Sequence, residues 1–93
     1  MALLVPGNPA IYFELGLLKY SIKDYNGAGQ AFASALTVAP QYANAQYYLG
    51  LTLARLGRLE EAKTYFEGLA VTNPDNKELQ TILTSLRAGK SPF

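Results

Sequence analysis

The amino-acid sequence predicts an all-α fold, and three observations favour it. The chain of 93 residues repeats its own pattern after 34 positions. Apolar residues recur at the spacing of helix turns, most clearly at Leu79, Ile82, Leu83 and Leu86. The short segments KDYN, PQY, GR and NPD separate the apolar stretches, and their residues stop or cap helices. A chain of this length forms one domain with a modest core.

The repeat is defined by a shift of the sequence against itself by 34 positions. The shift aligns Leu15, Gly16 and Leu17 with Leu49, Gly50 and Leu51, Ala28 with Ala62, Phe32 with Phe66, and Pro40 with Pro74. This pattern resembles the tetratricopeptide repeat, a helix-turn-helix unit that stacks into a solenoid. The resemblance implies about five antiparallel helices. The aromatic residue that usually opens the family pattern is Tyr12 in the first copy but Gln46 in the second.

The expected organisation follows this period. Residues 9–42 form a first repeat, 43–76 a second repeat, 77–88 a capping helix and 89–93 a tail. Within these segments we expect helices over residues 9–21, 26–38, 43–55, 59–71 and 76–88. Two explanations of residues 1–8 remain open. They are either the tail of a preceding repeat, since Pro6 precedes Pro40 by 34 residues, or a short leader that folds over the first helix.

A glycine stands inside the first helix of each repeat, where it costs about 1 kcal/mol relative to alanine. We expect Gly16 to face Ala28 and Gly50 to face Ala62, because helix axes approach to about 8 Å only where the residues at the crossing are small. The phenylalanine one turn after each alanine then belongs to the core. These residues have structural roles and no chemistry. Replacement of Gly50 by leucine is expected to unfold the domain or to lower its melting temperature sharply.

The first helix carries two apolar stripes on nearly opposite sides, at about 100° per residue. One stripe consists of Ile11, Leu15, Leu18 and Ile22, and the other of Phe13, Leu17 and Tyr20. A surface helix needs only one apolar face, so the second stripe must be covered or must be offered to a partner. By contrast, the segment 77–88 has a single stripe, which is typical of a terminal capping helix, and Gly89 and Pro92 signal its end.

The resemblance also implies a binding surface. In the family, the first helices of successive repeats line a concave groove that holds an extended peptide or a helix. The matching positions are Phe13, Glu14, Leu17, Tyr20, Ser21, Asn44, Tyr47, Tyr48, Leu51 and Arg55, with Glu78 and Ile82 from the capping helix. We therefore expect the groove to bind an apolar segment of a partner protein. Some of the tyrosines have an alternative role, which is to fill gaps between adjacent repeats.

One subfamily binds the C-terminal carboxylate of its ligand with lysine, asparagine and arginine side chains at fixed groove positions. Here those positions hold Phe13, Leu17, Tyr48, Glu78 and Ile82, none of which can hold an anion. We therefore do not expect tight, salt-sensitive binding of an acidic C-terminal peptide.

Composition excludes several other functions. Eight basic and seven acidic residues nearly cancel, and the lysines and arginines are scattered among acids, which disfavours nucleic-acid binding. The chain has no cysteine and no histidine, so we expect no metal site, no cofactor and no enzymatic activity. Glu60 and Glu61 resemble a carboxylate pair, but they open a helix, where negative charge suits the dipole. No segment predicts membrane insertion, and we expect a cytoplasmic or other soluble compartment.

A second hypothesis for the function is assembly. The stripe that contains Ile11, Leu18 and Ile22 would be bare if an upstream repeat were missing. It would then pair two copies into a homo-oligomer or attach the domain to the rest of a larger protein.

Overall fold

The computed structural model describes residues 8–93, and this part of the chain contains five helices and no strand. The helices are α1 (Pro9–Ser21), α2 (Tyr25–Val38), α3 (Ala43–Arg55), α4 (Leu59–Thr72) and α5 (Lys77–Arg87). The all-α prediction is confirmed, and every helix begins and ends within one residue of its expected bounds. Of the segment 1–8, for which two explanations were open, only Asn8 lies within the described residues.

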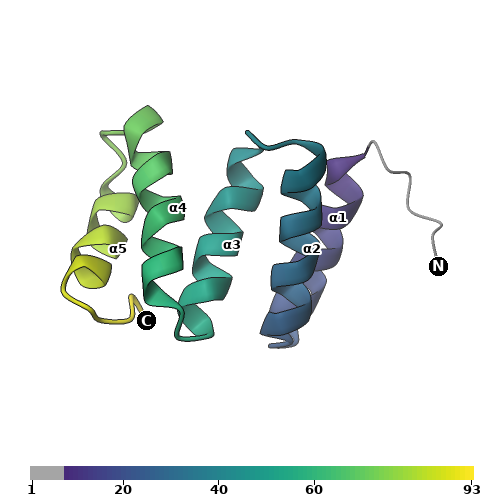
Figure 1. Cartoon of the computed structure of the whole chain (residues 1–93), viewed down its shortest axis with the longest axis horizontal. Coiled ribbons are helices and arrows are strands. Elements are labelled where there is room, and N and C mark those ends of the chain that lie inside the picture. The colour runs from purple at the N-terminus through teal and green to yellow at the C-terminus, as the bar shows by residue number, and fades with distance from the viewer. Residues whose placement is uncertain (1–7) are drawn as a thin grey trace.

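The five helices stand side by side as an elongated stack, in which each helix packs mainly on the next one in the sequence (Figure 1). The stack measures 41 × 26 × 17 Å. Each connection is short, so consecutive helices run in opposite directions, as a helix-turn-helix solenoid requires.

Local sequence fixes where three of the helices begin. The side-chain Oδ1 atoms of Asn8, Asp24 and Asn76 accept hydrogen bonds from backbone N–H groups in the first turns of α1, α2 and α5, at 3.1, 3.0 and 3.1 Å. Such caps satisfy N–H groups that have no partner within the helix. Helix α4 lacks a side-chain cap, but Glu60 and Glu61 lie in its first turn.

The ends of α1 and α3 show how one backbone conformation recurs at a distance of 34 residues. Gly57 follows α3 with φ +81°, and the N–H of Arg58 donates to the carbonyl of Leu53 at 2.9 Å. In the first repeat the equivalent residue is Lys23, which adopts the same left-handed conformation with φ +66°. Glycine takes this conformation readily, whereas lysine does so at a cost.

Each inner glycine packs against a phenylalanine ring. A Cβ atom added at Gly16 would lie 2.5 Å from Cε1 of Phe32, and one added at Gly50 would lie 2.8 Å from Cζ of Phe66. Both rings are fully buried. These glycines therefore permit close packing, but the residue that packs against them differs from the expected one. The nearest side chain is the phenyl ring of Phe32 or Phe66, whereas Ala28 and Ala62 were expected.

The departure from the family pattern at Gln46 also has a structural role. Its side-chain Nε2 donates to the backbone carbonyl of Pro40 at 2.8 Å, which fixes the turn between α2 and α3. Gln80, which lies 34 residues later, makes the equivalent but longer bond to the carbonyl of Pro74, at 3.4 Å. At this position the side-chain amide of Gln46 makes a hydrogen bond to Pro40, the last residue of the pattern in the first repeat, where the family pattern has a packed aromatic ring.

Candidate functional site

Four aromatic residues of the predicted groove come together on α1 and α3, namely Phe13, Tyr20, Tyr47 and Tyr48. Tyr48 of α3 lies at the centre of this array. Its ring centroid is 5.7 Å from that of Phe13, 6.1 Å from that of Tyr20 and 5.5 Å from that of Tyr47. Phe32 of the core stacks on Tyr48 at 5.8 Å. These spacings lie in the range where aromatic pairs attract each other.

Two further tyrosines extend the array beyond the predicted residues. Tyr42 lies 5.3 Å from Phe13, and Tyr25 lies 5.3 Å from Tyr20, centroid to centroid. Both stand at the start of a helix, in or next to a turn, where helical periodicity gives no information about direction. In the sequence, the one signal for Tyr25 and Tyr42 as groove residues is that they are aromatic and stand in segments next to the groove helices. We call the surface formed by α1, α3 and α5, including these rings, the aromatic face.

The rings of the aromatic face are partly buried, so they contribute to packing and still keep accessible surface. All four central rings and the side chains of Leu17 and Leu51 pack against the core cluster without being enclosed. Among the predicted polar residues, Glu14, Ser21, Asn44, Arg55 and Glu78 are exposed. Packing between repeats and ligand contact are therefore compatible roles for the same side chains.

Ile82 lies in the core rather than on the aromatic face. Its side chain is 8 % exposed and belongs to the buried cluster. The alignment of repeats placed it in the groove, but α5 has a single apolar face, which packs on α4. The contribution of α5 to the aromatic face is Glu78 instead.

Two hydrogen bonds hold the polar ends of the tyrosines. The Tyr47 hydroxyl donates to Oε2 of Glu78 at 3.0 Å, which joins α3 to α5. Partial burial, followed by this bond to the carboxylate, raises the pKa of Tyr47 to about 12. Nε of Arg55 donates to the Tyr20 hydroxyl at 3.2 Å, which joins α3 to α1 and raises the pKa of Arg55 above its ordinary value.

The comparison with protein families agrees with this arrangement. The family model described as tetratricopeptide repeat matches residues 19–86, from the last turn of α1 to the last turn of α5. The chain belongs to the tetratricopeptide repeat family. Repeats of this family generally mediate protein–protein interaction and typically form non-catalytic scaffolds. No curated protein matches the sequence significantly.

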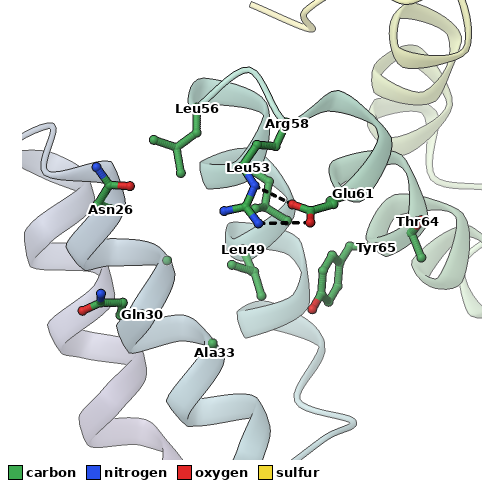
Figure 2. Close-up of a pocket in the computed structure, with 11 residues that line it drawn as sticks. Asn26, Gln30, Ala33, Leu49, Leu53, Leu56, Arg58, Glu61, Thr64 and Tyr65 are labelled. Carbon is green, nitrogen blue, oxygen red and sulfur yellow. Dashed lines mark hydrogen bonds and ion pairs between the residues drawn. The ribbon is translucent and has the colours of Figure 1, made fainter.

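The tetratricopeptide stack also has a cavity on the other side of α3. About 570 Å³ of space lies between α2 and α4, with Leu49, Leu53 and Leu56 pointing into it from α3 (Figure 2). Arg58 and Glu61 form an ion pair at its edge, with Nε 2.6 Å from Oε1. Around the axis of α3, these leucines lie about opposite to Leu51. Sequence periodicity does not predict this cavity, because the cavity depends on the distance between the second helices of the two repeats.

The two acidic residues in the first turn of α4, Glu60 and Glu61, are engaged in local ion pairs. Oε1 of Glu60 lies 3.2 Å from Nζ of Lys63, and Glu61 pairs with Arg58 across one helical turn. Exposed pairs of this kind contribute little to stability. None of the helices within residues 8–93 has the length and hydropathy that crossing a bilayer requires.

Proposed function

We propose that the aromatic face binds an apolar segment of a partner protein. The observation that carries the proposal is the connected array around Tyr48, in which partly exposed rings from α1 and α3 lie side by side on the surface of the stack. Aromatic rings supply large contact area at low cost in conformational entropy, and they dominate many interfaces. The exposed Glu14, Asn44 and Arg55 can orient a ligand at the edge of this surface.

The size of the surface sets the expected affinity. An accessible apolar patch of roughly 400 Å² would give on the order of 10 kcal/mol at about 25 cal/mol/Å². Association costs about 4–15 kcal/mol, so only a small surplus remains. We expect dissociation constants in the micromolar range. Because the contacts are mainly apolar, we expect the affinity to depend only weakly on salt concentration.

The test is a map of amide chemical shifts with a panel of short peptides that carry leucine and phenylalanine anchors. Bound peptides should shift the amides of Phe13, Leu17 and Tyr48. Leu51→Lys places a charge on the aromatic face and should weaken binding at least tenfold. Ala33→Lys is the matched control, because Ala33 is exposed on α2 at the edge of the cavity. Equal loss in both variants, or shifts confined to the cavity, would refute the assignment of the binding surface.

Self-association is a second candidate, and it has its own observation. Leu18 of α1 and Ile22, which directly follows the last residue of α1, lie one turn apart and are 61 % and 67 % exposed. Large aliphatic side chains with this exposure are found at protein interfaces. We propose that this edge of α1 pairs with a second copy of the chain. Sedimentation over a concentration series should show a dimer that Leu18→Glu abolishes, whereas a monomer at every concentration contradicts the proposal.

A further inference from the structure

An aromatic side chain of the chain itself lies at one end of the aromatic face. The ring centroid of Phe93 is 3.6 Å from Cζ of Arg55, which is the last residue of α3. The guanidinium of Arg55 also donates to the Tyr20 hydroxyl at 3.2 Å and lies 5.9 Å from the centroid of Tyr25. Phe93 thus reaches a cation that two tyrosines of the aromatic face already surround.

Backbone geometry after α5 directs the chain toward this place. Gly89 has φ +76°, and the N–H of Lys90 donates to the carbonyl of Ser85 at 2.9 Å. The chain therefore reverses at the end of α5, and residues 89–93 run back toward the end of α3 (Figure 1). The N–H of Phe93 donates to Oγ of Ser91 at 3.2 Å, within the segment. We call residues 89–93 the C-terminal segment.

The contact between Phe93 and Arg55 is one that an aromatic ring can form and leave reversibly. A planar guanidinium attracts the face of an aromatic ring, and the hydrogen bond to Tyr20 holds this guanidinium in position before a ring arrives. Phe93 nevertheless remains 53 % exposed, so the segment is not enclosed by the domain. A contact of this kind positions the C-terminal segment and still allows it to dissociate from Arg55.

We infer that Phe93 occupies the place of an aromatic side chain of the partner. The partner segment is then one that carries a phenylalanine, tyrosine or tryptophan over Arg55, next to the apolar residues that contact Tyr48. In the free protein the C-terminal segment competes with the partner for this place. The inference rests on the proposed function of the aromatic face and adds the chemistry of its ligand.

The expected strength of the competition follows from effective concentration. A segment tethered by a few residues presents its ring at an effective concentration in the millimolar range. If one ring on Arg55 binds with a dissociation constant of similar size, the tethered ring raises the apparent dissociation constant of a competitor about two- to fivefold.

The experiment uses the full chain, labelled with ¹⁵N, as wild type and as the variant Phe93→Ala. The probe is the peptide AGKSPF, which has the sequence of residues 88–93, and AGKSPA is its control. The side-chain Nε–H signal of Arg55 and the amide of Tyr20 report binding. AGKSPF should shift both signals in Phe93→Ala, with an apparent dissociation constant two- to fivefold lower than for wild type. AGKSPA should shift neither signal.

Lys90→Ala is the matched variant, because it changes the same segment and keeps Phe93, and it should titrate like wild type. Equal affinity of AGKSPF for wild type and Phe93→Ala would overturn the inference, and so would shifts away from Arg55 or no shift in either protein. The proposed function is tested separately, through the anchor peptides and the amides of Phe13 and Leu17. If those peptides bind and AGKSPF does not, the aromatic face keeps its function and only the role of Phe93 is wrong. If neither binds, both proposals fail.

Discussion

Gly16 lies so close to the Phe32 ring that a Cβ atom at this position would stand 2.5 Å from Cε1 of the ring. Real Cβ atoms do not approach so closely, and the ring is fully buried, so a Cβ atom here requires the core around it to shift. Gly16→Ala should therefore destabilise the protein, although alanine favours the helix by about 1 kcal/mol. We expect a net loss of about 1–2 kcal/mol in the free energy of unfolding, measured by urea denaturation.

The matched control is Gly68→Ala. Gly68 lies inside α4, is exposed, and would have no atom within 4 Å of an added Cβ. Alanine should therefore stabilise the protein by about 0.5–1 kcal/mol through helix propensity alone. If both alanine variants stabilised the protein equally, the packing account of Gly16 would be wrong.

Lys23→Gly should stabilise the protein. Lys23 has φ +66° at the end of α1, where its equivalent in the second repeat is Gly57 with φ +81°. Glycine removes the cost of the left-handed conformation, about 1–2 kcal/mol, and loses part of this gain through the entropy of the unfolded chain. A net increase of about 0.5–1 kcal/mol should appear in urea denaturation. The reciprocal variant Gly57→Ala should lower stability, and a gain there would contradict the reasoning.

Gln46→Ala should loosen the turn between the two repeats. The variant removes the hydrogen bond from Nε2 to the carbonyl of Pro40 and should cost about 0.5–1.5 kcal/mol. Amide hydrogen exchange should accelerate at the start of α3 more than at its end. Gln41→Ala, which changes an exposed side chain in the same turn, serves as the control and should leave the exchange pattern unchanged.

Stability should decline between about pH 10 and pH 12, partly because of Tyr47. The pKa of its hydroxyl is about 12 in the folded protein against an ordinary value of 10.0. The unfolded chain therefore releases this proton at lower pH than the folded protein, and unfolding becomes easier as the pH rises through this window. Tyr47→Phe cannot ionise and should show a smaller decline in the urea midpoint from about pH 9 to about pH 11. Gly68→Ala, which changes no titratable group, should decline as the wild type does.

The bounds of the helices could be predicted because the signals that set them are local. Asp24 and Asn76 cap the helices that follow them, and the apolar spacing of α5 defines its single face. The aromatic face could be anticipated from the 34-residue period, which places Phe13, Tyr20 and Tyr47 on helices that the repeat sets side by side.

Other features depend on distances between elements and could not be predicted. The exact tilt of α1 against α2 decides that Gly16 meets a phenyl ring, and the rotation of α5 decides that Ile82 is buried. The contact of Phe93 with Arg55 depends on the path of a segment that has no helical period. The cavity beside Leu53 likewise arises from the separation of α2 and α4, which no short stretch of sequence encodes.

The two ends of the stack differ in polarity. This difference determines at which end further repeats can be added to the domain. The outer side of α5 exposes Gln80, Thr81 and Thr84, whereas α1 and its C-cap expose Leu18 and Ile22. An additional helix pair joined ahead of α1 would gain energy by removing aliphatic surface from water. The same pair joined beyond α5 would have to strip water from amides and hydroxyls. Tandem designs built from this domain should therefore lengthen on the α1 side and terminate at α5.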